Sequence, residues 1–480
     1  MNSVDAVVVG SGPNGLAAAI TIARAGYKVR VLEAAANPGG GARTESLTAP
    51  GFLNDVCSAI HPLAVTSPFF RSLSLEKFGL QWIFSPYSVA HPLDGEGAVI
   101  LEPSLEETAH HLGVDGKRYR EFMAPLLHEW EDVISDILQP LVHWPRRPWL
   151  LARFGLGALL SAATLARHFL RGPRARALFA GVAAHSNAPL ENSGTAAIGL
   201  MLHLAAHARG WPLPRGGAQS LTQALVACLQ SFGGELQTET EVRTFQELPK
   251  SRWVFFDLTP RQVLRILGDR LPPSWQESFL SYRYGPGVFK MDWALSEPIP
   301  WKDKACARAA TVHLGGRLEE ILVSEAANAR GRLAKNPFVL LTQPSLFDRS
   351  RAPGTGHVAW AYCHVPHASS ADRQEAMEAQ IERYAPGFKD CILARHVMNP
   401  AALERKNPNL VGGDISGGEV SLRQILFRPR LSLSPYSLPL PGYYICSSST
   451  PPGPGVHGMA GFNAAVKALR TAGVKEIAGA

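Results

Sequence analysis

Three glycines near the N-terminus are spaced as G-x-G-x-x-G, and an acidic residue follows them where the next strand should end. The run 10–15 comes after an apolar stretch at 6–9 and precedes a helix expected over 16–25, and a second strand expected over 28–32 ends at Glu33. Such glycines allow a tight turn and a close approach of pyrophosphate, which a helix N-terminus attracts, and the acidic residue can bind a ribose hydroxyl. The pattern predicts an adenine dinucleotide site formed by Gly10, Gly12, Pro13, Asn14, Gly15 and Glu33.

A second glycine-rich turn, 34–44, follows Glu33 and ends with a cation. NAD-binding domains have no need of this turn. It resembles an element of flavoproteins in the amine oxidase and phytoene desaturase superfamily, where it reaches the cofactor pyrophosphate and ribityl chain. The resemblance implies FAD as the cofactor, with contacts from Gly40, Gly41 and Arg43. The alternative for Arg43 is a solvated loop cation.

The C-terminal region carries a third glycine-rich loop. A strand expected over 443–446 leads into 447–459, and a small-residue helix is expected from about 460 to 469. In the same superfamily this loop and helix face the pyrimidine side of the flavin, and the positive helix end favours negative charge there. Many relatives have an acidic residue after the strand, where this chain has serines. The resemblance implies contacts to FAD from Ser448, Gly455, Val456, His457, Gly458 and Met459, and from the backbone of Val242 near the adenine.

Candidate catalytic residues are few, because in a flavoenzyme the cofactor carries out the redox step. Lys290 alternates with apolar residues on a strand expected over 287–295, and the stretch is similar to the amine oxidase strand whose lysine reaches flavin N5 through water. The alternatives are an ion pair with Asp292 or a solvent-facing position. His457 lies in the C-terminal loop, either as an acid or base or as a hydrogen-bonding group. His61 follows the first cofactor segment and is the third candidate.

Composition limits the class of protein. The chain has 480 residues, of which 46% are hydrophobic, enough for two or three domains with a large core. Its six cysteines form no C-x-x-C pair, which argues against a disulfide reductase and a cysteine-ligated metal. We expect no metal site. The net charge of +7 has no aromatic-interleaved basic motif, so we expect no nucleic-acid partner.

The apolar segment 149–170 contains arginines and a histidine, so a membrane-spanning helix is not expected there. Two interpretations stay open: a core helix of the substrate domain, or an interfacial helix that dips into a membrane. No extension precedes the first strand, so no cleaved leader is expected. We expect a cytoplasmic protein, with peripheral contact to the inner membrane and a homodimer as open alternatives.

The cofactor domain is expected to be assembled from separated segments. The fold class is α/β: a Rossmann-like FAD-binding domain of the GR2 type, with an α+β substrate domain built from insertions. The FAD-binding domain is assigned to 1–75, 214–275 and 425–480. The substrate-binding domain is assigned to 76–213 and 276–424, with a helical part at about 104–210. Further expectations are strands over 235–245, 338–343 and 357–364, a helix over 372–384, and a glycine-dense loop, 407–418, near the flavin.

The resemblance covers the whole chain and is closest to the phytoene desaturase-like branch, on the segments 290–293 and 446–459. It implies an FAD-dependent oxidoreductase that passes hydride from a large apolar substrate, of polyene or isoprenoid type, to flavin N5, or that isomerises it. Oxygen or a quinone would then reoxidise the flavin. One alternative is an amine-oxidase-type enzyme that oxidises a C–N bond. Another is a non-catalytic FAD-binding scaffold that acts through protein partners.

Overall fold

A parallel sheet forms one side of the molecule. The computed structural model describes residues 4–140 and 142–479. The sheet has the order β16-β10-β1-β2-β9, and all of its strand pairs are parallel. Its strands are β1 (Ala6–Val9), β2 (Val29–Leu32), β9 (Glu235–Gln237), β10 (Trp253–Phe256) and β16 (Tyr443–Ile445). Strands β1 and β10 are buried along their whole length, as expected for a parallel sheet covered on both faces.

Three helices cover one face of this sheet: α1 (Pro13–Arg24), α11 (Ala218–Ser231) and α18 (Met459–Thr471). Proline at its first position favours an early helix start, and α1 begins three residues before the expected helix. Helices α1 and α18 cross so closely that a Cβ on Gly461 would overlap the Asn14 carbonyl oxygen. The third glycine-rich loop is thereby held beside the first.

The strand expected over 235–245 was wrong in length. Strand β9 ends at Gln237, level with the end of β2, and the chain then runs on without strand structure. The Glu239 and Thr240 N–H groups donate to the Ala35 and Glu33 carbonyls, at 3.2 and 2.8 Å. The segment therefore stays beside Glu33 without extending the sheet.

A second, seven-stranded sheet has the order β15-β11-β14-β13-β12-β6-β7, and only its β12–β6 pair is parallel. Its strands are β6 (Tyr87–Leu93), β7 (Gly97–Leu101), β11 (Gly287–Leu295), β12 (Ala309–Leu314), β13 (Val339–Thr342), β14 (His357–Val365) and β15 (Ile392–Met398). The strands expected over 287–295, 338–343 and 357–364 are confirmed to within a residue at each end. Helix α15 (Gln374–Tyr384) confirms the expected helix over 372–384.

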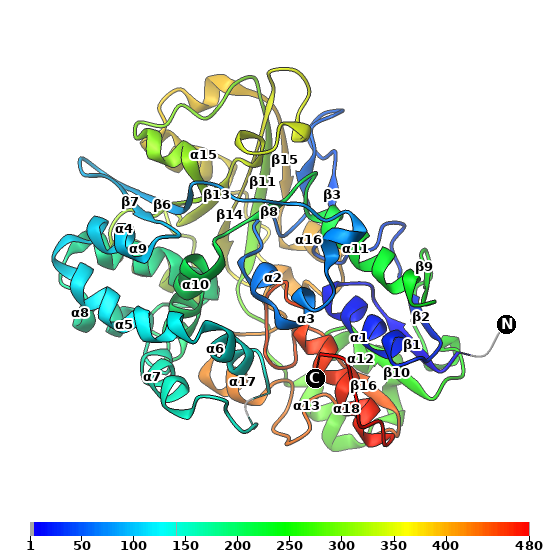
Figure 1. Cartoon of the computed structure of the whole chain (residues 1–480). Helices are drawn as coiled ribbons and strands as arrows, with labels where there is room; N and C mark the ends of the chain where they lie inside the picture. The colour runs from blue at the N-terminus through cyan, green and yellow to red at the C-terminus, as the bar shows by residue number, and fades with distance from the viewer. Residues whose placement is uncertain (1–3, 141, 480) are drawn as a thin grey trace.

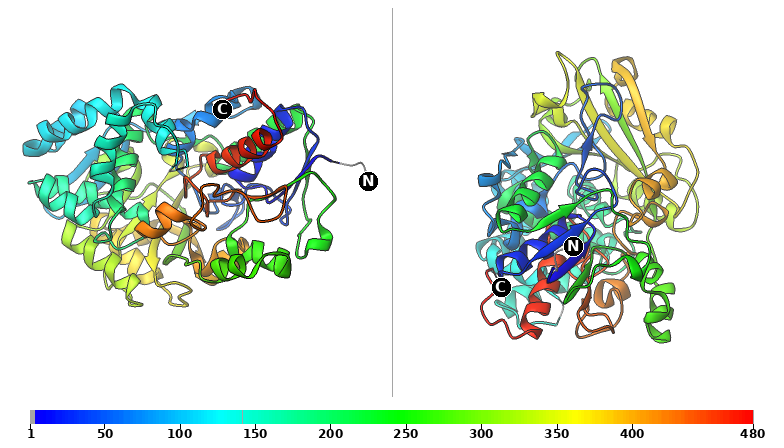
Figure 2. Two further views of the ribbon diagram at one scale, coloured as in Figure 1. Left: turned by 90° about the horizontal axis from the view of Figure 1, so that it is seen from below. Right: turned by 90° about the vertical axis from the view of Figure 1, so that its right-hand side faces the viewer.

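A helical part lies on the side of the molecule away from the parallel sheet, as two views show (Figures 1 and 2). Its helices are α4 (Leu105–His111), α5 (Gly116–His128), α6 (Trp130–Ile137), α7 (Pro148–Ala158), α8 (Ala162–Phe169), α9 (Pro173–Ala183) and α10 (Thr195–Arg209). No helix in 4–140 or 142–479 is long and apolar enough to cross a membrane.

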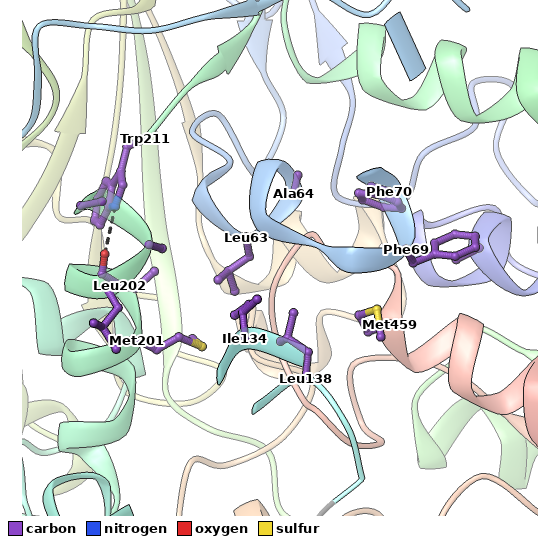
Figure 3. Close-up of a cluster of buried hydrophobic side chains, with 14 of the residues drawn as sticks. Leu63, Ala64, Phe69, Phe70, Ile134, Leu138, Met201, Leu202, Trp211 and Met459 are labelled. Carbon is purple, nitrogen blue, oxygen red and sulfur yellow. Dashed lines mark hydrogen bonds between the residues drawn. The ribbon is translucent and has the colours of Figure 1, made fainter. Parts of the chain in front are cut away.

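Two short helices, α2 (Pro62–Thr66) and α3 (Pro68–Arg71), join the helical part to the cofactor side. Figure 3 shows Leu63 of α2 pointing toward Ile134 of α6, with Phe69 and Met459 farther along the same buried cluster. Trp211 closes the other end, where its Nε1–H donates to the Leu202 carbonyl at 3.2 Å. The mixed α/β fold with a Rossmann-like part is therefore confirmed.

The remaining helices surround the two sheets. They are α12 (Pro260–Leu267), α13 (Pro273–Leu280), α14 (Leu318–Ala329), α16 (Pro400–Lys406) and α17 (Leu422–Phe427). Two short ribbons lie outside the two sheets: β3 (Thr44–Glu45) with β4 (Asn54–Asp55), and β5 (Trp82–Ile83) with β8 (Leu213–Pro214).

Candidate cofactor and active site

The first glycine-rich turn is fixed by Glu33 at the end of β2. The Ser11 N–H and Oγ–H both donate to Glu33 Oε2, at 2.9 and 2.5 Å, and the Ala35 N–H donates to Oε1 at 2.9 Å. Gly10 has φ +99°, a conformation that favours glycine. A carboxylate has further lone pairs, so these bonds leave Glu33 able to accept from a ribose hydroxyl. That contact stays a prediction.

A buried carboxylate that sequence analysis did not select lies under this turn. Asp257, at the carboxyl end of β10, accepts the Gly15 N–H at 2.9 Å. A Cβ on Gly12 would overlap Asp257 Oδ2, and one on Gly15 would lie 3.0 Å from Asp257 Cβ. The turn needs glycines partly because Asp257 fills the space beneath them. The signal that could have identified Asp257 is its place directly after an apolar strand, because ligands of such sheets bind at the carboxyl ends of the strands.

The pKa of Asp257 is raised from its ordinary 3.8 to about 7, mainly by burial. The Gly15 N–H lowers this pKa, and the Glu33 charge raises it. Between these values the folded protein holds a proton that the unfolded chain has lost. The free energy of unfolding contributed by protonated Asp257 is therefore fully present below pH 3.8 and is lost as pH rises toward 7, by at most about 1.4 kcal/mol per pH unit.

We expect Asp257→Asn to remove this contribution. The difference in unfolding free energy between wild type and variant should fall as pH rises from about 4 to about 7. Buried histidines such as His61 and His203, whose pKa values burial lowers to about 4 and about 3, titrate in the opposite sense in both proteins and cancel in the difference. Urea unfolding across this pH range measures it, and parallel curves would contradict the role of Asp257.

The three glycine-rich segments meet at one place. A Cβ on Gly40 would lie 3.2 Å from the Gly12 Cα, and the Gly39 N–H donates to Ser11 Oγ at 3.2 Å. The C-terminal loop is held from the other side, because Ser67 Oγ–H donates to the His457 carbonyl at 2.6 Å. The predicted cofactor residues of the two turns and the C-terminal loop are thus brought together around the start of α1.

One ring nitrogen of His457 accepts a backbone hydrogen bond, and the other forms none of ordinary geometry with residues 4–140 or 142–479. Its Nδ1 accepts the Met459 N–H at 3.0 Å, and burial lowers its pKa to about 4 although the Gly453 and Pro454 backbone lies close to the ring. The neutral ring therefore carries its proton on Nε2, which has no hydrogen-bond partner among the described residues. The geometry makes His457 a hydrogen-bond donor toward a ligand; a role as general acid or base stays a prediction.

His61 caps the start of α2 and is connected to the second glycine-rich turn. Its Nε2 lies 3.1 Å from Ser58 Oγ, and the Ser58 N–H donates to the Gly41 carbonyl at 3.1 Å. Burial lowers the pKa of His61 to about 4, so the ring is neutral near pH 7. Its Nδ1 is buried and lacks a partner in the part of the chain that the structure describes.

Lys290 is paired with Asp292 on the same face of β11. Both side chains are buried, at 2% and 0% exposed, and Lys290 Nζ binds Asp292 Oδ2. His396, which is opposite Asp292 on the neighbouring strand β15, places its Nδ1 3.5 Å from Asp292 Oδ2. Cys57 lies beside Gly41 of the second glycine-rich turn, and burial raises the pKa of its thiol whereas the Lys290 and Arg43 charges lower it. The distance from Lys290 to a bound flavin stays a prediction.

The loop 407–418 reaches the cofactor segments. The Asn409 side-chain amide donates to the Asp257 carbonyl at 3.0 Å, and the Ser449 Oγ–H donates to the Gly417 carbonyl at 2.7 Å. A Cβ on Gly417 would lie 3.0 Å from Ser448. The loop therefore packs between the first and third glycine-rich segments.

The residues present fit a polar dinucleotide cofactor. Buried polar atoms without a hydrogen-bond partner among the described residues include Asn14 Oδ1, Arg43 Nε, His61 Nδ1 and His457 Nε2. Each unpaired buried polar group costs about 1–3 kcal/mol, so such groups are rare without a ligand or water. Four of the 23 such atoms belong to residues that the sequence assigned to the site, and the other 19 belong to residues that it did not assign. In the first turn of α1, Pro13 has no N–H and the Gly15 and Leu16 amides are already bonded, to Asp257 and to the Gly12 carbonyl, so the Asn14 amide is the one left for the pyrophosphate.

Aromatic residues lie on both faces of the seven-stranded sheet near Lys290. Trp293 points to the opposite face of β11 from Lys290, where its Nε1–H donates to Glu378 at 3.1 Å, so it belongs to the core. Trp360 and Tyr362 share the Lys290 face and pack edge to face, with centroids 5.3 Å apart. His185 packs against His313, with their Nε2 atoms 3.0 Å apart.

An apolar cavity of about 700 Å³ lies within the helical part. It is bounded by α5, α7, α8, α9 and α10. Its lining contains no carboxylate, and its polar side chains are a tyrosine, a threonine, two histidines and Arg153. Sequence analysis found the apolar segment 149–170 but not the cavity, because the cavity depends on how five helices pack.

Comparisons with known proteins agree with this geometry. The family model of an NAD(P)-binding Rossmann-like domain matches residues 8–73. The rat pyridine nucleotide-disulfide oxidoreductase domain-containing protein 2 is 27% identical, over 96% of this chain and 92% of the relative. Phytoene desaturase (neurosporene-forming) of Rhodobacter capsulatus is 24% identical, over 95% and 92%.

The structure of putrescine oxidase bound to putrescine has a TM-score of 0.59 and 17% identity, and the match covers 98% of each chain. At this identity the likeness concerns the fold alone. Whole-length sequence relatives, a whole-length structural match and three converging glycine-rich segments agree with one another. The chain therefore fits the superfamily of oxidoreductases that contains the amine oxidases and the phytoene desaturases.

Proposed function

We propose that this protein binds FAD and removes hydrogen from a large apolar substrate of polyene or isoprenoid type, or isomerises it. The observation that carries the proposal is the match to a phytoene desaturase over 95% of the chain, and a cavity of about 700 Å³ in the helical part, whose wall holds no carboxylate and one cation, Arg153, would take an apolar chain. An alkylammonium substrate would find no counter-charge there, whereas an apolar chain would bury its surface favourably.

The residues of the chain would bind, orient and exclude water. The Asn14 amide at the start of α1 and the Arg43 side chain would hold the pyrophosphate, and His457 Nε2–H would donate a hydrogen bond to the cofactor. Lys290, fixed by Asp292, would hold a proton on the buried face of β11. When bound, FAD would accept a hydride from a substrate C–H bond, the substrate would lose a proton, and the two electrons would pass to oxygen or a quinone.

A second function is favoured by one observation. Trp360 and Tyr362 lie on the same face as Lys290, and the Lys290 ammonium is 5.6 Å from the centre of the Trp360 ring. Aromatic faces attract amine cations, so an amine-oxidase-type reaction on a C–N bond is the alternative. The two rings meet edge to face, at 77°, and do not form the two parallel walls that would enclose a flat amine group.

Anaerobic reduction of the FAD-loaded protein tests these proposals. We expect the visible absorbance of the flavin to bleach with a detergent-dispersed polyene or isoprenoid and not with primary amines. Bleaching by amines alone would favour the amine oxidase. If dithionite bleaches the flavin but no organic donor does, the protein is a scaffold that binds FAD without oxidising a substrate. Readmission of air or of a quinone then identifies the electron acceptor.

A further inference from the structure

An exposed apolar surface surrounds the start of α7, and we call it the α7 face. Trp144 is 91% exposed, Trp149 87% and Leu156 76%. Trp149 and Leu156 are seven residues apart and so lie on one side of the helix. Contiguous apolar patches of this kind are uncommon on soluble monomers and mark interaction surfaces. The α7 face consists of Val142, Trp144, Trp149, Leu156, Leu159 and Leu160.

The cavity of the helical part opens on this face. Trp149, Leu156 and Leu160 are exposed and also line the cavity, so they form its mouth. The inner wall is formed by buried residues such as Leu178 and Phe179 of α9. The outer apolar surface and the interior of the cavity are therefore one continuous apolar surface.

The segment of the chain that contains the α7 face is rich in arginine. Residues 137–190 contain seven arginines and no lysine, aspartate or glutamate, a surplus equal to the net charge of +7 of the whole chain. Of these seven arginines, only Arg146 and Arg147 form ion pairs with carboxylates of the described residues. The Arg153 guanidinium binds the Glu121 and Phe122 carbonyls, which do not neutralise it. The seven are Arg146, Arg147, Arg153, Arg167, Arg171, Arg174 and Arg176.

We propose that the α7 face is the surface through which this protein binds an anionic lipid bilayer, with the mouth of the cavity against the acyl chains. Tryptophan is the side chain most favoured at the membrane interface, and arginines nearby attract anionic headgroups. Leucines of an interfacial helix enter the boundary between headgroups and acyl chains.

A second copy of the chain is a poorer occupant of the α7 face. A two-fold interface would bring each set of arginines against the same set on the partner. Like charges at close range would oppose that association, whereas an anionic bilayer compensates them. An apolar ligand could then pass from the bilayer into the cavity without crossing water. This route rests on the proposed function, whereas the lipid binding does not.

Flotation of the FAD-loaded full-length protein with vesicles tests the proposal. We expect the protein to float with phosphatidylcholine vesicles that contain phosphatidylglycerol, and to bind much less to phosphatidylcholine alone or at high salt. Trp144→Ser/Trp149→Ser should reduce binding about tenfold or more. Arg153→Gln/Arg167→Gln/Arg171→Gln should remove the preference for anionic vesicles.

A matched pair of leucines provides the control. Leu156 is 76% exposed, and Leu280, at the end of α13 elsewhere on the molecule, is 75% exposed (Figure 1). Leu156→Ser should weaken vesicle binding and Leu280→Ser should not, with FAD content and unfolding temperature unchanged in both. Equal losses, no flotation on anionic vesicles, or a dimer in solution that protects Trp149 from modification would overturn the proposal. Vesicle binding without flavin reduction by any apolar donor would overturn the proposed function instead.

Discussion

Gly15→Ala is expected to abolish the retention of FAD and to destabilise the protein. A Cβ on Gly15 would overlap the Gly10 carbonyl oxygen and would lie 3.0 Å from Asp257 Cβ. A backbone oxygen cannot rotate away as a side chain can, so α1 must shift from β1. Overpacking of this kind typically costs about 1–3 kcal/mol, and more where the backbone is rigid. The shift also displaces the Asn14 amide that would hold the pyrophosphate.

The ratio of flavin to protein absorbance after purification measures the first effect, and thermal unfolding measures the second. Gly155→Ala is the matched control, because a Cβ at this position in α7 meets no atom within 4 Å. It should leave FAD binding unchanged and stabilise the helix by up to about 1 kcal/mol. A Gly15→Ala protein that retains FAD and has wild-type stability would show that α1 can move away from β1 without loss of the cofactor site.

Asp292→Ala is expected to have the second large effect. It leaves the Lys290 ammonium, which is 2% exposed, without its carboxylate partner. Breaking one side of a buried ion pair costs about 3–5 kcal/mol, whereas replacing both partners by apolar residues of similar size is often nearly neutral. We therefore expect Lys290→Met/Asp292→Leu to recover most of the stability that Asp292→Ala loses. Urea unfolding of the single and double variants measures the coupling between the two residues.

The double variant also separates stability from chemistry. Its folded state should bind FAD, and its flavin should reoxidise in air at least about tenfold more slowly if Lys290 transfers or holds a proton beside the flavin. Trp293→Phe, on the other face of β11, is the control and should reoxidise at the wild-type rate. An unchanged rate in the double variant would remove Lys290 from the site and leave it as one half of a structural ion pair.

Local patterns were sufficient to predict the cofactor turns. The spacing of Gly10, Gly12 and Gly15 lies within six residues, and the apolar strand before it and the small-residue helix after it are also local. The start of α18 and the Gly39–Gly41 turn could be predicted for the same reason. What joins these segments in space was available only through the resemblance to a family, because no spacing in the sequence states that Gly461 lies on Asn14.

Long-range contacts account for what sequence analysis missed. Asp257 contacts Gly15 across 242 positions, and its importance depends on β10 lying next to β1. The face of β11 on which Trp293 lies needs no long-range contact to be predicted. Strand alternation places it opposite Lys290, three positions away, so the sequence alone could have assigned the two side chains to different faces. The cavity depends on the packing of five helices and leaves no pattern that periodicity can detect.

The parallel sheet also sets the order in which the protein can be made. Strand β1 pairs with β10, and β10 pairs with β16, whose first residue, Tyr443, is synthesised 187 residues after the last residue of β10, Phe256. Until then β10 has an open edge, and the start of α1 lacks the neighbouring helix α18. Such sheets fold slowly and expose unpaired edges while they wait. The cofactor turn of a nascent chain therefore stays incomplete until β16 and α18 are made, and a dinucleotide that binds the finished turn, as proposed for FAD, would stabilise the complete sheet.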